Sequence, residues 1–290
     1  MSKEPLIIIE AKTDPDLYVA LFNGYVAYAP YAIQITKSIF ERHIIGFAHE
    51  IKGRCLIGKQ GAAHGIIHFG IQERGNNISE GFIYLIFSDS NQLAQDLTAL
   101  AEEWFAQNNI EKITAYLGGE SPYQYILHGA EPYCWAGNYH ANNAFTRMGY
   151  DLSLDILVMS MEIKGSFAYE IAPDFKEEMT RNDDLALAGT FTAHDGHIWA
   201  GVCGYHYLKE ASRQFGKKYG QINIWLNNAY HGTGIAQKMM AAVHSRLAEL
   251  GVSKILLATN QALYRAVKFY EKLGYAVEPI RAYSYVKRLR

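Results

Sequence analysis

One segment of this 290-residue chain constrains the fold more than any other. An apolar run ends at Leu226, passes through Asn227-Asn228-Ala229-Tyr230-His231-Gly232-Thr233-Gly234, and continues as a long amphipathic segment. We expect a helix from about Thr233 to Leu250, because apolar side chains recur there at steps of three or four residues and share one face. The apolar positions are Ile235, Met239, Val243, Leu247 and Leu250. A strand is therefore predicted to lead directly into a helix through a glycine-rich turn.

The start of this helix has the properties of an anion site. The first N–H groups of a helix have no intrahelical acceptor, and the helix dipole adds partial positive charge there. Small residues at Gly232, Gly234 and Ala236 let a ligand approach the backbone closely, which suits a phosphate or pyrophosphate. A simple turn and helix cap is the alternative interpretation.

Two familiar phosphate loops do not fit this turn. A Rossmann loop needs a third glycine, where this chain has Gln237, and an acidic residue about 20 positions further on, where it has Leu257. A P-loop needs Gly-Lys-Ser/Thr after the turn, which is absent from this segment. The turn therefore predicts a phosphate site of another type.

The rest of the C-terminal half alternates between apolar runs and helical patterns. Strands are predicted at 185–192, 197–206, 221–226, 252–259 and 282–286, with a second helix at about 262–273 that Gly274 closes. Adjacent strands followed by strand–helix alternation predict an α+β fold, a mixed α/β sheet with flanking helices.

The N-terminal half gives a fainter version of the same order. It has a predicted strand at 82–87, a helix at 91–107, a strand at 112–117, and a helix near 141–150 that ends in Gly-Tyr as the segment 264–275 does. This duplication predicts two similar domains in tandem, 1–163 and 164–290, with the boundary at Lys164-Gly165. The first copy has no glycine where its strand meets its helix, and Asp89 there would repel a phosphate. We expect a degenerate copy that does not bind the cofactor, with Asp89 or Ser90 as an ordinary helix cap.

Charge and cysteine content narrow the class of protein. Residues 1–163 carry 10 Lys+Arg against 18 Asp+Glu, and residues 164–290 carry 17 against 11, so the second half is the basic one. This asymmetry favours an anionic ligand for the second half, unless the charges are only solvated faces. The basic side chains are scattered, so no nucleic-acid partner is expected. Three distant cysteines without a CxxC pair predict no metal site, and with no secretory or membrane-spanning run they predict a cytoplasmic protein that does not bind a membrane.

Two motifs in this order resemble the GNAT superfamily of N-acetyltransferases. His231-Gly232-Thr233-Gly234-Ile235-Ala236 resembles motif A, Gln/Arg-x-x-Gly-x-Gly/Ala, with His231 as a departure from the usual Gln or Arg. Ala266-Val267-Lys268-Phe269-Tyr270-Glu271-Lys272-Leu273-Gly274-Tyr275 resembles motif B, Ala-x-x-Phe-Tyr-x-x-x-Gly-Phe. The resemblance covers about residues 166–290 well and the first half weakly, which implies a tandem GNAT architecture with a degenerate N-terminal copy.

The resemblance implies acetyl-CoA as cosubstrate and a role for each matching position. Backbone groups of Ile224, Trp225 and Leu226 would pair with the pantetheine arm. Backbone amides from Gly232, Thr233, Gly234, Ile235 and Ala236, with His231 beside them, would hold the pyrophosphate. The family often has an Asn before motif B, and Asn260 is the nearest candidate here. Tyr270 would protonate the leaving thiolate, unless it is only a core aromatic of its helix.

The general base is the least defined part of the prediction. Many family members place a Glu early in the strand before motif A, where this chain has Tyr219-Gly220-Gln221. His206 is the best candidate because a histidine has a pKa suited to the task, although it could instead pack or bind substrate.

The sequence thus predicts an acyl-CoA-dependent N-acetyltransferase whose acceptor amine attacks the thioester directly. In the family, the region between the first two strands usually forms two helices over the acceptor, and this chain has only the short segment 174–182 there. The resemblance therefore implies that the first domain supplies part of the acceptor pocket. The acceptor is a small-molecule or peptide amine, and a homodimer is possible. The alternative is a non-catalytic acyl-CoA-binding sensor or scaffold, motivated by the missing Glu and by His231.

Overall fold

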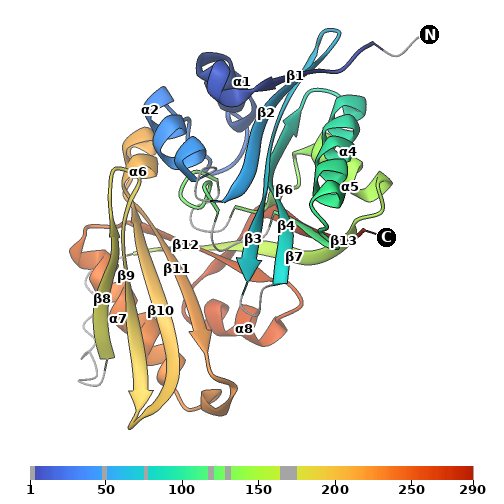
Figure 1. The fold of residues 1–290 in the computed structure, drawn as a ribbon. Coiled ribbons are helices and arrows are strands. Elements are labelled where there is room, and N and C mark those ends of the chain that lie inside the picture. Colours follow the sequence, from blue (N-terminus) through green and yellow to red (C-terminus); the bar gives the residue numbers. More distant parts are fainter. Residues whose placement is uncertain are drawn as a thin grey trace. The chain divides into compact units, whose positions relative to one another are not determined.

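The chain folds into two compact units. The computed structural model describes residues 4–47, 51–74, 78–116, 121–127, 132–163 and 175–289 (Figure 1). The first unit consists of Met1–Ile156 together with Ile280–Arg290, and the second of Leu157–Pro279. The expected boundary at Lys164-Gly165 lies outside the described residues. The change of unit falls at Ile156/Leu157 instead, and the C-terminal segment joins the first unit, so 164–290 is not one compact domain.

The sheet of the first unit has the strand order β1-β2-β3-β4-β5-β13. Its strands are β1 (Ile7–Glu10), β2 (Lys52–Gln60), β3 (Ala63–Arg74), β4 (Ile78–Ser88), β5 (Lys112–Ala115) and the part of β13 (Ala276–Arg288) from Ile280 onward. The short β6 (Cys134–Trp135) also pairs with β13. Neighbouring strands are antiparallel except β4 and β5, which run parallel. The C-terminal strand pairs with β5 through Tyr285↔Ala115 and three further positions, which explains its place in this unit.

Helices cover both faces of this first sheet. They are α1 (Pro15–Val26), α4 (Asn91–Gln107) and α5 (Tyr139–Arg147), with the short helical segments η1 (Ala11–Thr13), α2 (Lys37–Ile39) and η2 (Phe40–Ile45). Helix α4 lies on β2 and β3 where Gly58 and Gly65 leave room for Leu97 (Figure 1). The predicted helix 91–107 is confirmed, and Ser90 caps it by accepting the N–H of Leu93.

The sheet of the second unit has the order β7-β12-β11-β10-β9-β8. Its strands are β7 (Asp151–Glu162, in this unit from Leu157), β8 (Phe175–Asn182), β9 (Ala186–Asp195), β10 (Ile198–Leu208), β11 (Tyr219–Leu226) and β12 (Lys254–Asn260). Its helical segments are α6 (Lys209–Phe215), η3 (Asn228–Tyr230), α7 (Ile235–Glu249) and α8 (Tyr264–Lys272). The mixed sheet with flanking helices confirms the predicted α+β fold.

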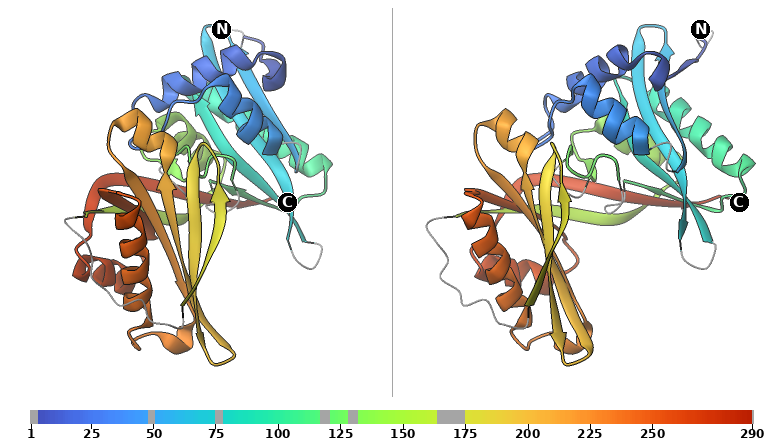
Figure 2. Two further views of the ribbon diagram at one scale, coloured as in Figure 1. Left: turned by 90° about the vertical axis from the view of Figure 1, so that its left-hand side faces the viewer. Right: turned by 60° about the vertical axis from the view of Figure 1, so that its left-hand side comes forward.

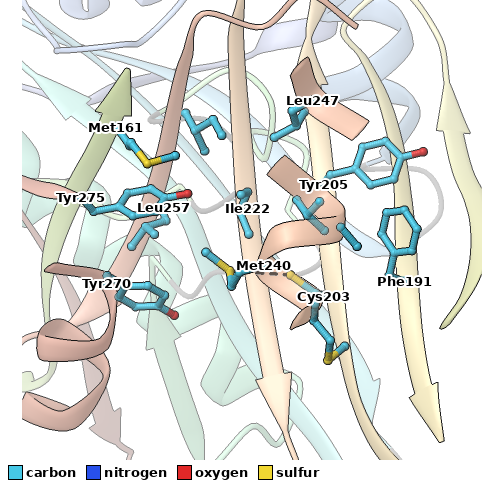
Figure 3. Packing of buried hydrophobic residues seen from close by; sticks show 14 of the residues in the cluster. Met161, Phe191, Cys203, Tyr205, Ile222, Met240, Leu247, Leu257, Tyr270 and Tyr275 are labelled. Carbon is cyan, nitrogen blue, oxygen red and sulfur yellow. Dashed lines mark hydrogen bonds between the residues drawn. The ribbon is translucent and has the colours of Figure 1, made fainter. Parts of the chain in front are cut away.

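Helix α7 packs along one face of β9, β10 and β11, as both views in Figure 2 show. Its buried side chains Met239, Met240 and Val243 share one cluster with Cys203 of β10 and Ile222 of β11. Figure 3 shows Met240 next to Cys203 and Ile222. This is the apolar stripe that the spacing from Ile235 to Leu250 predicts. Replacing Met239 or Met240 by Ala would cost about 2–5 kcal/mol of stability. We call the face of strands β8 to β11 that points away from α7 the far face.

Two features of the second unit, and the length of the last strand, differ from the sequence prediction. The segment expected to link two strands is itself the edge strand β8, whose residues are mostly exposed and therefore carry no alternating apolar signal. Helix α6 was not predicted, because seven residues are too few for a clear helical period. The last strand runs from Ala276 to Arg288 rather than over 282–286. Among the described residues, no helix is long and apolar enough to cross a membrane.

Candidate functional site

Strands β11 and β12 are paired over only part of their length. Their parallel register covers Tyr219↔Lys254, Gly220↔Ile255 and Gln221↔Leu256, and it contains no further pair although both strands are fully described. On its other side β11 pairs with β10 along its whole length, from Tyr219 to Leu226. The part of β11 beyond the N–H of Ile222, which the last pair Gln221↔Leu256 uses, therefore has a backbone edge with no strand partner.

The direction of the backbone groups on this edge follows from one hydrogen bond. The N–H of Asn227 donates to the carbonyl of Ala200 at 2.9 Å, so these two residues form a hydrogen-bonded pair. Because such pairs alternate along an antiparallel ladder, the backbone N–H and C=O of Ile222, Ile224 and Leu226 point away from β10. The parallel pair Gln221↔Leu256 uses the N–H of Ile222, so we call the carbonyl of Ile222 together with the backbone groups of Ile224 and Leu226 the open edge of β11. An extended ligand with its own amides can pair with them as a strand would.

The turn after the open edge presents a group of backbone amides. Gly232 and Gly234 adopt φ values of 83° and 87°, which few residues other than glycine adopt, and a Cβ added at either would meet nothing within 4 Å. In the part of the chain that the structure describes, four backbone amides of this turn donate no hydrogen bond, those of Gly232, Gly234, Ile235 and Ala236. We call these four amides the amide cradle. At the N-terminus of a helix, they form a site for an anion.

Local hydrogen bonds hold the cradle in place. The 3₁₀ turn η3 leads into it, and Asn227 stabilises this turn by accepting the N–H of Ala229 at 3.1 Å. The hydroxyl of Tyr230 donates to Asp195 at 3.2 Å. The hydroxyl and the amide of Thr233 both donate to the carbonyl of Tyr230, so this amide is occupied within the turn, contrary to the prediction that it faces the pyrophosphate.

Tyr270 lies in the buried cluster that includes side chains from both strands beside the open edge. Its ring packs in one cluster with Ile222 of β11 and Leu257 of β12, and it is 8% exposed. Figure 3 shows the ring next to Leu257, with the hydroxyl directed away from that side chain. The position fits both interpretations from the sequence, because a core aromatic and a proton donor at the open edge would occupy the same place.

His206 does not have the pKa that its residue type suggested. It is buried on the far face opposite Gln221, and desolvation, helped by the charge of Arg181, lowers its pKa to about 4. An imidazole with this pKa is neutral at pH 7 and holds a proton weakly, so the expectation of a pKa suited to general-base catalysis is wrong. The sequence did not indicate that β10 buries this residue.

Three other predicted positions have mixed surroundings. Trp225 is paired with Val202, so its backbone groups point to β10, and its indole is 70% exposed against the ring of Trp199. Asn260 ends β12 and accepts the N–H of Ala262 at 2.9 Å, which makes it a turn residue. His231 is exposed beside the cradle, and its N–H donates to Asn228.

Comparison with known proteins agrees with this geometry. Residues 157–275 match the acetyltransferase (GNAT) family, so this segment is a GNAT acetyltransferase domain. Uncharacterized N-acetyltransferases of Mycobacterium bovis and Mycobacterium tuberculosis are 35% identical over 90 residues, which is 31% of this chain and 53% of each relative. The chain thus spans about half the length of these relatives.

Solved structures extend the similarity to the whole chain. A tandem GNAT protein from the clavulanic acid biosynthesis pathway covers 98% of both chains with a TM-score of 0.64 and 10% identity. A glucosamine N-acetyltransferase region of a fungal multi-domain beta-N-acetylglucosaminidase covers 99% of this chain and 38% of that one, with a TM-score of 0.66 and 10% identity. At such identities the likeness concerns the fold, which is that of two GNAT-like units in tandem.

The first unit has a counterpart of the open edge, and its own side chains occupy it. Strands β4 and β5 also pair in parallel over three positions, and helix α4 follows β4 as α7 follows β11. Ile86 is the third residue from the C-terminal end of β4, as Ile224 is from the C-terminal end of β11. The hydroxyl of Tyr116 accepts the N–H of Ile86 at 2.8 Å and donates to its carbonyl at 2.7 Å, and the amide of Asn138 donates to the same carbonyl. The backbone groups that a ligand would need are thus already bonded.

Sequence reasoning missed this role of Tyr116. The residue follows β5 directly, where the second unit has Leu257 after the last paired residue of β12. A tyrosine at a strand end gives no signal of its own, and the contact becomes visible only once the register of β4 and β5 is known.

Tyr116→Phe is expected to lower the free energy of unfolding by about 1–3 kcal/mol, because it leaves the buried N–H of Ile86 without an acceptor. Urea denaturation followed by circular dichroism measures the change. Tyr28→Phe is the matched control, since Tyr28 is 83% exposed and should unfold as wild type. Equal stability of the two variants would contradict the role given to Tyr116.

Proposed function

We propose that the second unit transfers an acetyl group from acetyl-CoA to an amine by direct attack. The amine nitrogen forms a bond to the thioester carbonyl carbon, the carbon–sulfur bond breaks, and the thiolate leaves as coenzyme A after taking up a proton. The amine loses one proton to solvent, because His206 is too weak a base at neutral pH. No covalent enzyme intermediate is needed, so positioning and electrostatic stabilisation account for catalysis.

The observation that carries this proposal is the sequence continuity of the open edge and the amide cradle. The open edge ends at Leu226, and the cradle begins six residues later at Gly232. A pantetheine arm carries amides and ends in a pyrophosphate, so it matches an unpaired strand edge followed by a helix N-terminus. The backbone groups of Ile224 and Leu226 can pair with the pantetheine amides, whereas those of Trp225 point to β10 and cannot.

Tyr270 is the proposed general acid. It is a neutral donor on the face of the sheet that α7 and α8 cover, where water has little access. A proton delivered to the sulfur as the carbon–sulfur bond breaks prevents the thiolate from returning to the carbonyl.

The first unit, by this proposal, binds no acetyl-CoA. Tyr116 and Asn138 bond to Ile86, and the junction of β4 with α4 contains Asp89 rather than glycine, with its carboxylate accepting the N–H of His64. One acetyl-CoA should therefore bind per chain. The proposal also includes the cytoplasm as the location, which the three buried free thiols of Cys55, Cys134 and Cys203 support.

Two measurements test the proposed function. Calorimetric titration with acetyl-CoA should give one site per chain, and a second site would contradict the role of the first unit. Release of coenzyme A in the presence of spermidine, glucosamine or a tripeptide with a free N-terminus should exceed the rate without amine. Binding without turnover of any amine would favour the non-catalytic sensor instead.

A further inference from the structure

The far face of the second sheet exposes one polar side chain next to the open edge. Side chains alternate along β11, so Ile222 and Ile224 face the core with α7, and Asn223 between them faces the other way. Ile222 is 3% exposed, whereas Asn223 is among the exposed residues. Its neighbours along β11 on the far face are Gln221, which is buried, and Trp225, which is exposed.

A glycine leaves room for this side chain. Gly204 of β10 is the direct cross-strand partner of Asn223. A Cβ added at Gly204 would overlap the amide oxygen of Asn223 and would come within 3.2 Å of its Cγ. The carboxamide therefore lies across β10, in the space that any other residue at position 204 would fill. Gly204 has an extended backbone without positive φ, so this space is the reason for glycine that the structure offers.

The surroundings make Asn223 accessible to a ligand at the open edge. Helix α7 covers the core face of β11, which leaves the far face, where Asn223 is exposed, as the side from which an acceptor would approach the open edge. On that face Gly204 contributes no side chain, and the next strand adds the half-buried hydroxyl of Thr190, which pairs with Gly204. A carboxamide and a hydroxyl on one face of the sheet suit a small ligand with N–H and O–H groups.

We infer that Asn223, which lies across Gly204, positions the acceptor, a small primary amine with hydrogen-bonding groups, by accepting an N–H of the attacking nitrogen. The inference rests on the proposed acetyl transfer and adds the residue that orients the acceptor. Asn223 does not exchange a proton in the reaction. Its carboxamide oxygen directs the nitrogen lone pair toward the thioester carbonyl, and the proton that the amine loses goes to solvent, as in the proposed mechanism.

The test is a double-mutant cycle with Asn223→Ala and Gly204→Ala. Coenzyme A release is measured with spermidine, glucosamine and the tripeptide amine, and KM and kcat are determined for the amine that wild type acetylates. Asn223→Ala should raise KM for the amine about tenfold, the equivalent of one hydrogen bond, with the acetyl-CoA dissociation constant unchanged. Gly204→Ala should have a similar effect, because its methyl group displaces the carboxamide.

The double variant distinguishes a positioning role from a structural one. In the Asn223→Ala background the clash is gone, so Gly204→Ala should add nothing, and the two effects should be strongly non-additive. Asn228→Ala is the matched control, an exposed asparagine of η3 whose side chain should leave KM unchanged. Thermal melts test whether each variant is folded. If Gly204→Ala does not fold, the KM of Asn223→Ala alone decides the test.

The outcomes separate this inference from the proposed function. A KM within twofold of wild type for Asn223→Ala, with turnover intact, would overturn the inference and leave the acetyl transfer in place. Additive effects of the two substitutions would also overturn it. Failure of wild type to acetylate any of the three amines would overturn the proposed function, and the inference with it.

Discussion

Gly234→Asp is expected to weaken acetyl-CoA binding by at least about 100-fold, beyond detection in a calorimetric titration in which wild type binds. Gly234 is the residue before α7, and its φ of 87° belongs to the left-handed region. An aspartate there costs about 1–2 kcal/mol of backbone strain. Its carboxylate would also stand among the four amides of the cradle, where it would accept their hydrogen bonds and repel a pyrophosphate.

Two control variants separate strain from charge. Gly234→Ala imposes the backbone cost alone, so it should weaken binding far less than the aspartate does. Gly216→Asp places the same residue at another exposed glycine with positive φ, after α6, with nothing within 4 Å of the added Cβ. It should bind acetyl-CoA as wild type. Equal losses for Gly234→Asp and Gly216→Asp would mean that the loss reflects general destabilisation, and the cradle would lose its support.

The cradle is the part of the site that the sequence predicts best, because its cause is local. Glycines at 232 and 234 and the apolar period from Ile235 onward act within a few residues, and the structure places α7 at Ile235–Glu249 against the expected 233–250. The error in the cradle is also local in origin. Thr233 bonds back to Tyr230 because a hydroxyl near a turn competes for backbone carbonyls, a contact that residue type alone does not fix.

Features that depend on strand register could not be read from the sequence. The open edge exists because β11 and β12 stop pairing after Gln221↔Leu256, and no residue in either strand marks that point. The bond from Tyr116 to Ile86 has the same origin. So does the return of Ile280–Arg290 to the first unit, where Tyr285 pairs with Ala115 across 170 positions of the chain.

Burial explains why the pKa expected for His206 was wrong. A histidine in Tyr205-His206-Tyr207 has an ordinary pKa if it is exposed and a much lower one if it is not. The alternation of β10 places His206 on the far face, which a sequence pattern would read as the more accessible side. The low pKa of about 4 follows from desolvation in the folded chain. Asn223, on the same face, is exposed instead, so neighbouring positions of one face differ in a way that periodicity does not encode.

Tyr270→Phe is expected to lower kcat about 100-fold while leaving the acetyl-CoA dissociation constant unchanged. General acid catalysis contributes about 10²–10⁴-fold, and the low end applies because a thiol with a pKa of about 8.5 leaves more easily than an alcohol or an amine. The ring itself remains in place in the variant, so the packing of Ile222 and Leu257 beside it is kept. The initial rate of coenzyme A release at saturating amine and acetyl-CoA, divided by the enzyme concentration, gives kcat.

Two neighbouring tyrosines make the result specific. Tyr264→Phe changes the same helix at a residue that is 67% exposed, and it should keep the wild-type kcat. Tyr275→Phe removes a buried hydrogen bond of 2.8 Å to His244, so it should lower the melting temperature and leave kcat nearly unchanged. If Tyr270→Phe behaves like Tyr275→Phe, with a lower melting temperature and nearly unchanged kcat, Tyr270 is a core residue and solvent protonates the thiolate. A loss of kcat without a loss of stability would identify it as the group that protonates the sulfur.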